Sequence, residues 1–371
     1  MRIAIISRGW WCCIHGGSEK FMHRLAEEFI NLGHRVTAVT MKLCESMPQQ
    51  RYPLEVIDLG KYNLVKAIQF SRLAAKCVAE LNSDIVIVNS YWSELSPRFI
   101  SSIPTIMVIH DIGFLKNVKA HLRTVKRYIL SLSAKHSKAI VTPTETVKND
   151  LVRYLKLDPA KIQVIGFEGV DGPFHREHKE NAWFDIVQVA RFAPNKGQLI
   201  LIDAFRKVVR EVPSAKLWLV GSSGIKIKQR VYLEEVKHLA SEINNDMGRE
   251  VVRVVVDAPN VDVYYRIADV CVAPSIGEEG YGLTVVECMA YGKPVIASDI
   301  FVETGVVNED RAYIFPRGNA DKLAELLLYV YRNYSEALRK ADRGLEYARK
   351  CSWRKVAEFF LKVIDETVSS R

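Results

Sequence analysis

The sequence has 371 residues, of which 49% are hydrophobic and 26% charged, a composition that favours a globular protein with two domains over a single core. Its net charge of +9 is uneven, because residues 1–165 hold 23 Lys and Arg against 13 Asp and Glu, while the remainder holds 29 against 30. This asymmetry predicts an anionic partner for the first half, and the lack of any run of eighteen apolar residues excludes a membrane-spanning helix.

The start of the chain and its cysteines indicate a cytoplasmic protein. Residues 1–7 enter a strand pattern directly and are too short for the apolar region of a secretory signal. The seven cysteines form no C-x-x-C metal or redox pair, so we expect reduced thiols. The adjacent Cys12 and Cys13 fit small apolar side chains in a loop better than reactive thiols.

The chain opens with a pattern typical of a doubly wound α/β sheet. Gly16 and Gly17 precede an amphipathic helix for which Ser18 is a suitable N-cap. No G-x-G-x-x-G string is present, so the dinucleotide fingerprint is absent, and a bare Gly-Gly is more often an ordinary tight turn. The pattern predicts strands at 2–6 and 36–39 on either side of a helix at 18–32.

Alternating strands and helices continue through the first half, with strands near 54–58, 84–89, 105–109, 139–142 and 162–165 and a helix near 63–81. Thr144 or Thr146 can cap a helix that follows the strand at 139–142. The strand at 105–109 ends at His110, and ligands of open α/β sheets bind at the carboxyl ends of strands. The alternative to a binding role for His110 is a structural one, in which its buried side chain bonds to a backbone carbonyl.

Residues 116–138 form the most basic stretch and keep a helical stripe of apolar side chains. A solvated surface helix is the plainer interpretation of its charges. Contact with anionic lipid head groups or an anionic acceptor is the other. The basic side chains concerned are Lys116, Lys119, Arg123, Lys126 and Arg127.

A charged run at 175–181 reads as a linker, and a strand at 185–189 opens the second half. Arg191 and Lys196 then flank a proline-bearing turn before a helix at 198–210. Two cations at a helix N-terminus oppose the helix dipole unless an anion lies between them, so this pair indicates a diphosphate site. Further strands are expected at 216–220 and 252–256, with helices at 225–245, 262–268, 322–340 and 353–368.

The densest signal lies at residues 270–297, where a short strand, a glycine-punctuated loop, a helix and a second strand make one βαβ unit. The loop glycines let backbone N–H groups approach an anion at the start of that helix. Glu279 lies in the loop, and Glu287 lies on the helix among residues expected to be buried. A sugar's vicinal hydroxyls would satisfy the Glu287 carboxylate, although a solvated Glu279 and a Glu287 paired within the sheet are the alternative.

Together these motifs resemble one family. Residues 279–297, with their Glu-Gly-Tyr-Gly-Leu, second glutamate and Pro-Val-Ile-Ala, are similar to the signature of the large retaining GT-B glycosyltransferases of group 1 type, which include bacterial mannosyltransferases and sucrose synthases. The string Gly16-Gly17-Ser18-Glu19 resembles the family's opening motif. The segment 190–197 resembles its Gly-Arg-Leu…Lys-Gly motif, with Ala190 in place of glycine, and residues 300–304 depart from its Gly-Gly-x-Pro-Glu loop.

The resemblance implies a fold of two Rossmann-like doubly wound parallel-sheet domains facing a central cleft. Residues 1–174, with a C-terminal helix 353–371 that crosses back, would bind the acceptor, and residues 182–352 would bind the nucleotide sugar. It also implies residue roles: His110 and Glu279 position the donor sugar, and Glu287 holds the ribose. The diphosphate would be held by Gly16, Gly17, Arg191, Lys196, Gly280, Tyr281, Gly282 and Leu283.

The function expected from this resemblance is transfer of a hexosyl group, with retention, from a nucleotide-diphosphate sugar to an acceptor hydroxyl on a carbohydrate, a lipid or another anionic molecule. The sequence contains no Asp-x-Asp pair, so we expect no metal and no cofactor. The basic face would place the protein at the inner surface of the membrane. The alternative is a non-catalytic GT-B partner that binds membrane or a sister enzyme, whereas nucleic-acid binding lacks an aromatic-interleaved basic stripe.

Overall fold

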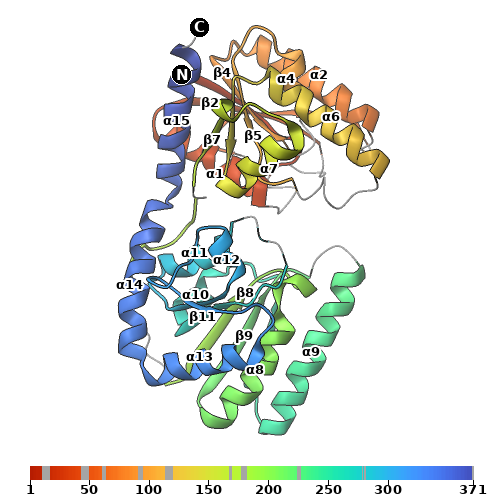
Figure 1. The fold of residues 1–371 in the computed structure, drawn as a ribbon. Helices are drawn as coiled ribbons and strands as arrows, with labels where there is room; N and C mark the ends of the chain where they lie inside the picture. The colour runs from red at the N-terminus through yellow and green to blue at the C-terminus, as the bar shows by residue number, and fades with distance from the viewer. Residues whose placement is uncertain are drawn as a thin grey trace. The chain divides into compact units, whose positions relative to one another are not determined.

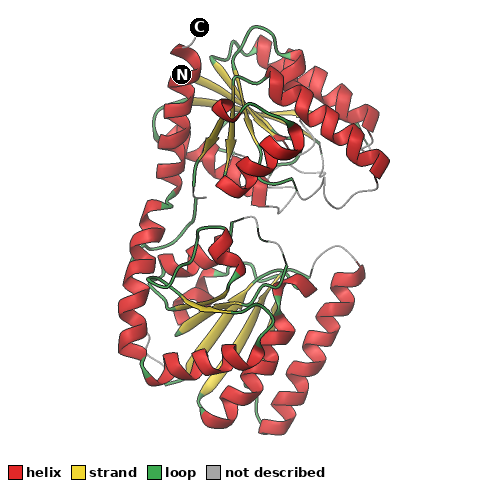
Figure 2. Cartoon of the chain, in the orientation of Figure 1, coloured by secondary structure: helices red, strands yellow, loops and turns green. Residues whose placement is uncertain are grey.

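The computed structural model describes residues 1–10, 17–42, 50–60, 64–90, 95–112, 120–166, 169–176, 182–223, 227–277, 279 and 281–369. The chain divides into two compact units (Figure 1), the first made of residues 1–169 and 353–371 and the second of residues 170–352. Each unit is a parallel sheet covered by helices on both faces (Figure 2). This is the doubly wound arrangement predicted from the alternating strand and helix patterns.

Within its described residues, the first unit builds a seven-stranded sheet in the order β3-β2-β1-β4-β5-β6-β7, with all pairs parallel. The order reverses between β1 and β4, because Ile3 of β1 pairs with Val36 of β2 on one side and with Ile85 of β4 on the other. The strands are β1 (Arg2–Ile6), β2 (Arg35–Met41), β3 (Leu54–Ile57), β4 (Ile85–Asn89), β5 (Thr105–Val108), β6 (Ala139–Thr142) and β7 (Ile162–Val164).

The helices of the first unit pack on both faces of this sheet because successive strand residues point to opposite sides. Ile3 and Ile5 of β1 belong to the apolar cluster under α1 and α15, whereas Ala4 and Ile6 belong to the cluster under α2. The helices are α1 (Gly17–Asn31), α2 (Leu64–Glu80), α4 (Ser96–Phe99), α6 (Ala120–His136), α7 (Glu145–Leu155) and α15 (Trp353–Ser369).

The last helix belongs to the first unit, as the sequence predicted. Trp353 and Phe360 of α15 lie with their ring centroids 5.5 and 6.0 Å from that of Phe21 in α1. All three side chains are buried, so α15 completes the core on that face of the sheet. No helix in the described part of the chain is both long and apolar enough to cross a bilayer.

The second unit has, in its described residues, a six-stranded parallel sheet in the order β10-β9-β8-β11-β12-β13. Here the order reverses between β8 and β11, which pair through Ile186 and Val270. The strands are β8 (Phe184–Val189), β9 (Ala215–Gly221), β10 (Val252–Val256), β11 (Val270–Ala273), β12 (Val295–Ser298) and β13 (Tyr313–Phe315).

Helices again cover both faces, and α8 and α11 follow the two strands, β8 and β11, between which the order reverses. The helices of this unit are α8 (Gln198–Glu211), α9 (Ile227–Met247), α10 (Asp262–Ile267), α11 (Leu283–Ala290), α12 (Ile300–Glu303), α13 (Ala320–Arg332) and α14 (Tyr334–Lys350). A single 3₁₀ turn, Pro194–Lys196, precedes α8.

Three local predictions were wrong. The segment 322–340 is not one helix, because the amide of Asn333 donates to the Tyr329 carbonyl and its backbone (φ −119°, ψ 42°) leaves the helical region, so α13 ends and α14 begins there. Ser18 does not cap α1, since the helix already starts at Gly17 and the Ser18 hydroxyl donates to Glu19. The short strand β13 was missed. Thr144, in contrast, does cap α7 by accepting from the N–H of Val147.

The second unit begins at Val170, before the charged segment 175–181 that was predicted to be a linker. Arg176 lies within that segment and is fixed to the second unit. Its guanidinium donates to the backbone carbonyl of Gly292 at 3.1 Å and to the carboxylate of Asp342 at 2.6 Å.

Candidate functional site

The two loops that leave β8 and β11 pack against each other at the carboxyl edge of the second sheet, where the strand order reverses. The N–H of Ile276 donates to the carbonyl of Asn195 at 2.9 Å. Gly197 adopts φ +69°, and a Cβ there would lie 2.0 Å from the carbonyl oxygen of Pro274. Only glycine permits this approach, which joins the segments 190–197 and 274–277 into one surface at the position where doubly wound sheets bind ligands.

Lys196 and Glu279 meet at this edge. The Lys196 ammonium lies 2.6 Å from Oε1 of Glu279, and the two side chains are 20% and 9% exposed. The Ser275 hydroxyl donates to the same carboxylate oxygen at 2.5 Å. In this structure the charge of Lys196 is therefore compensated by the carboxylate of Glu279.

Arg191 stands on the same loop with its side chain exposed. Its backbone is fixed, because the Gln198 amide donates to the Arg191 carbonyl at 3.1 Å. The Gln188 amide holds the loop from the other side by donating to the Lys196 carbonyl at 2.8 Å. The loop is rigidly anchored while the guanidinium reaches solvent, which suits a side chain that neutralises an incoming anion.

The start of α11 lies beside this pair. Gly282 is the N-cap at φ +111° and has no side chain to cap the helix, so the first N–H groups of α11 are available to a ligand. Leu283 is the first helical residue. Gly280, another residue predicted to contact the diphosphate, lies outside the described residues.

The side chain of Tyr281 is 3% exposed and turns into the second unit. Its hydroxyl lies 2.9 Å from the hydroxyl of Tyr347 and 3.5 Å from Sγ of Cys351. Burial raises the pKa of the Tyr281 hydroxyl far above its usual range, so it stays protonated. Any contact that Tyr281 makes with a donor is therefore a backbone contact, and the side chain anchors the loop.

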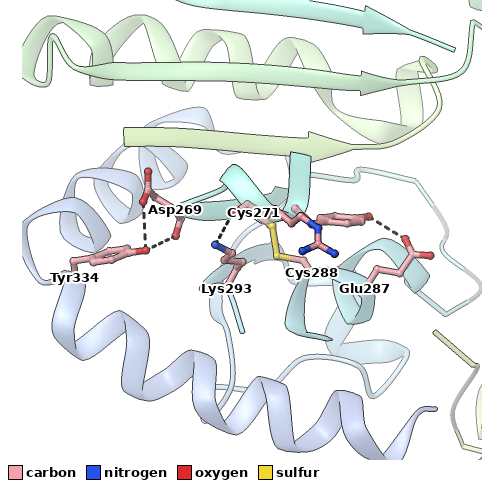
Figure 3. Close-up of a disulfide and its surroundings, with 8 residues drawn as sticks. Asp269, Cys271, Glu287, Cys288, Lys293 and Tyr334 are labelled. Atoms are coloured by element: carbon pink, nitrogen blue, oxygen red, sulfur yellow. Dashed lines mark hydrogen bonds between the residues drawn. A yellow bond between two sulfur atoms is a disulfide. The ribbon is translucent and has the colours of Figure 1, made fainter. Parts of the chain in front are cut away.

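Glu287 lies on α11, partly buried, and accepts a hydrogen bond from the Tyr265 hydroxyl to Oε2 at 2.9 Å (Figure 3). The next residue, Cys288, forms a disulfide with Cys271 of β11, and their Cα atoms are 6.5 Å apart. The prediction of reduced thiols was wrong for these two cysteines, because the packing of α11 over β11 brings residues 17 positions apart into contact. Spacing along the chain gives no sign of this pairing.

The first unit contributes its own predicted residues at the carboxyl edge of its sheet. Gly17 is the first residue of α1. His110 follows β5, with its ring edge-on to Phe21 of α1 at 5.0 Å between centroids. Gly16 lies outside the described residues, as do Cys12 and Cys13.

The predicted basic face is described only in part, since Lys116 and Lys119 lie outside the described residues. On α6, Arg123 and Arg127 are exposed and Lys126 is half-buried. Tyr128 and Val125 beside them are 68% and 46% exposed. This part of α6 therefore presents cations together with large apolar side chains.

The comparisons with known proteins agree with the geometry. Residues 174–350 match the family of glycosyl transferases group 1, and residues 15–166 match glycosyltransferase family 4. The chain therefore consists of a glycosyltransferase family 4 domain followed by a glycosyl transferases group 1 domain. It is 28% identical to a phosphatidyl-myo-inositol mannosyltransferase of Mycobacterium leprae over 48% of this chain and 45% of that protein, so the match spans about half the length of this curated relative.

Two further matches cover more of this glycosyltransferase. An uncharacterised glycosyltransferase of Methanocaldococcus jannaschii is 28% identical over 71% of this chain and 69% of that protein. The crystal structure of Anabaena HepE in complex with UDP-glucose superimposes with a TM-score of 0.76 over the full length of both chains, at 17% identity. The fold is therefore GT-B, with two parallel-sheet α/β domains.

Sequence reasoning missed several residues that hold the site of this glycosyltransferase together. Ser275 and Gln188 fix Glu279 and Lys196, and Tyr265 fixes Glu287. Ser275 directly follows Pro274 at the end of a predicted strand, so its position at the sheet edge was a usable signal. Tyr265 sits 22 positions from Glu287 on another helix, and no spacing rule connects them. No group of metal-binding side chains occurs among the residues that the structure describes.

Proposed function

We propose that the protein transfers a glycosyl group from a nucleotide-diphosphate sugar to an acceptor hydroxyl, with retention at the anomeric carbon. The observation that carries the proposal is the Lys196–Glu279 pair beside the open N-terminus of α11. A cation, a carboxylate and a helix N-terminus without a side-chain cap at one sheet edge suit a donor whose diphosphate and sugar need opposite charges nearby. The match of residues 174–350 to the group 1 glycosyl transferases supports the same assignment.

The diphosphate is the first part of the donor that these residues can bind. An ammonium has three donors, and Lys196 uses one toward Glu279, so it can also donate to a phosphate oxygen. Arg191 supplies a second cation, and the first N–H groups of α11 supply hydrogen bonds along the helix dipole. As the glycosidic bond breaks, negative charge grows on the leaving diphosphate, and these groups stabilise it without a metal ion.

The two carboxylates would bind the donor's sugar and its ribose. Glu279 carries a negative charge that favours the positive charge developing at the anomeric carbon. Glu287 accepts hydrogen bonds from the vicinal hydroxyls of the ribose. In the first unit, His110 and the N–H of Gly17 lie at the carboxyl edge of that unit's sheet, and we assign them to the donor sugar and the diphosphate.

For the acceptor we propose a lipid or another anionic molecule. The relative from M. leprae is named as a phosphatidyl-myo-inositol mannosyltransferase. In this chain the excess positive charge lies in residues 1–165, and Asp111 and Glu145 enclose a stretch without a single acidic residue. Exposed Arg123 and Arg127 beside Tyr128 suit attachment to an anionic surface.

Nucleotide binding tests this proposal. Calorimetry with UDP, GDP and ADP in the presence of EDTA should show tight binding of one nucleotide, which should also raise the melting temperature. Glu287→Gln should weaken that binding without lowering the melting temperature of the free protein. Absence of binding by all three nucleotides would overturn the proposal, and binding without turnover of any nucleotide sugar would favour a non-catalytic GT-B partner.

A further inference from the structure

Tyr265 is buried in the second unit, and its hydroxyl donates the hydrogen bond that holds the Glu287 carboxylate. Its hydroxyl lies 2.9 Å from Oε2 of Glu287, although the residue as a whole is only 2% exposed. The ring packs on Tyr291 with centroids 5.4 Å apart. A buried hydroxyl must find a partner, and here it finds the one side chain proposed to hold the ribose.

The helix that carries Tyr265 is itself held by the turn between α11 and β12. The ammonium of Lys293, a residue only 3% exposed, donates to the carbonyl of Arg266 at 2.8 Å (Figure 3). The Cys271–Cys288 disulfide holds α11 to β11 at the residue after Glu287. Tyr265 and Glu287 therefore stand on two elements whose separation is fixed by independent contacts.

The hydroxyl of Tyr265 also remains a donor across the accessible pH range. Burial, and then the charge of Glu287, raise the pKa of Tyr265 well above its ordinary value. The hydrogen bond occupies one of about four acceptor positions of the carboxylate.

We propose that Tyr265 is a positioning residue that orients the Glu287 carboxylate for the 2′- and 3′-hydroxyls of the donor's ribose. This inference rests on the proposed function. A glutamate side chain has three rotatable torsions, and holding it in one orientation before the ligand arrives lowers the entropic cost of binding. Tyr265 also lines a small pocket together with Thr284, which lies one helical turn before Glu287.

The test compares two ligands in each protein. The affinity of UDP, GDP or ADP, whichever binds, is measured by calorimetry beside that of its 2′,3′-dideoxy analogue. In the wild type the dideoxy analogue should bind at least about tenfold more weakly, as expected when hydrogen bonds to a charged acceptor are lost. In Tyr265→Phe, which keeps the ring and its packing on Tyr291, this ratio should fall to about threefold or less.

The ratio is a property of the folded fraction alone, so a partly unfolded Tyr265→Phe still gives an interpretable result. If Tyr265 had only a structural role, Tyr265→Phe would lower the affinity for both ligands equally and leave the ratio unchanged. That result would overturn the inference. Tyr264→Phe is the matched control, because Tyr264 is the neighbour on α10 and packs on Trp218 at 5.7 Å instead. Its ratio should equal that of the wild type.

Failure of the inference can be told apart from failure of the proposed function. If the wild type discriminates between the two ligands and Glu287→Gln does not, while Tyr265→Phe still does, Glu287 binds the ribose without help from Tyr265. If neither the wild type nor any variant binds a nucleotide, both proposals are wrong.

Discussion

The ammonium of Lys196 and the carboxylate of Glu279 are 2.6 Å apart, although 83 positions separate the two residues in the sequence. The two residues lie on loops that follow different strands, Lys196 after β8 and Glu279 after β11. The strand order of the second sheet reverses between these two strands. Because both side chains are mostly buried, each charge depends on the other for compensation before any ligand is present. A bound donor diphosphate would share the Lys196 ammonium with the Glu279 carboxylate, which already contacts it.

Removal of Lys196 tests this arrangement. Lys196→Ala should lower turnover of the matched nucleotide sugar by at least about 100-fold, because a charge partner of the departing diphosphate is lost. It should also destabilise the protein by about 1–3 kcal/mol, since the nearly buried Glu279 loses a partner. Arg191→Ala should show the first effect without the second, because its side chain is exposed.

Lys207→Ala is the control for these variants. Lys207 pairs with Asp321 through two exposed side chains, and such pairs contribute about 0–1 kcal/mol. Turnover should stay at the wild-type level. Wild-type turnover in both Lys196→Ala and Arg191→Ala would show that the diphosphate binds elsewhere.

The disulfide gives a prediction for stability. Cys271 and Cys288 close a loop of 17 residues, and a cross-link of that length stabilises a fold by about 3 kcal/mol. The double variant Cys271→Ala and Cys288→Ala should therefore unfold at a lower urea concentration than the wild type. Thiol titration of the denatured, unreduced protein should find five of the seven cysteines free if no other pair is oxidised.

Cys77→Ser is the comparison for that experiment, because Cys77 is a free, half-buried cysteine on α2. Its urea midpoint should shift far less. A thiol count of seven in protein purified without reductant would contradict the disulfide.

The basic part of the first unit predicts binding to anionic lipid. Cosedimentation with vesicles should rise with the fraction of anionic lipid and fall with salt, since each Lys or Arg near the surface contributes about 1 kcal/mol. Changing Arg123, Lys126 and Arg127 to Glu should abolish it. Changing Arg206 and Lys207 of α8 to Glu is a control of similar charge in the second unit. No sedimentation at low salt would leave a water-soluble anionic acceptor as the use of this charge.

The stability of the first unit should depend on pH through His23. Burial lowers the pKa of His23 below its ordinary 6.5, although Glu27 opposes the shift, and Nδ1 lies 2.6 Å from the Tyr52 hydroxyl. The unfolded chain therefore binds a proton at a higher pH than the folded one, so the free energy of unfolding should fall as pH drops from about 7 to 5. The pKa of His34 is lowered too and should contribute in the same direction.

Urea unfolding at several pH values measures this effect. In His23→Gln the decline between pH 7 and 5 should be shallower than in the wild type. An equal or steeper decline would mean that His23 is already charged in the folded protein.

The sequence predicted the fold well because buried parallel strands such as Ile85–Asn89 are apolar up to their last residue and alternate with amphipathic helices. It also located Lys196 and Glu279 at strand ends. It did not predict that they bind each other, because the approach of the two loops depends on Gly197 lying against Pro274. Contacts between side chains on separate elements, such as Tyr265 with Glu287, follow from three-dimensional packing that no periodicity encodes.

The break at Asn333 was missed for a different reason. The residues on both sides of it keep a helical pattern, so periodicity alone favours one long helix. The local bond from the Asn333 amide to the Tyr329 carbonyl decides the outcome. Short polar side chains that compete with the backbone are a weak signal in a single sequence.

A time course of nucleotide-sugar turnover followed by proton NMR tests the central claim most directly. UDP-glucose and GDP-mannose would be supplied in EDTA, with water or a lipid acceptor, and the spectrum would report release of the diphosphate and the anomeric configuration of the first product. We predict that one of the two donors releases its nucleoside diphosphate and gives a product with the donor's anomeric configuration. In Lys196→Ala the signals of both the released diphosphate and the product should be lost. An inverted product, or turnover unaffected by Lys196→Ala, would contradict the account.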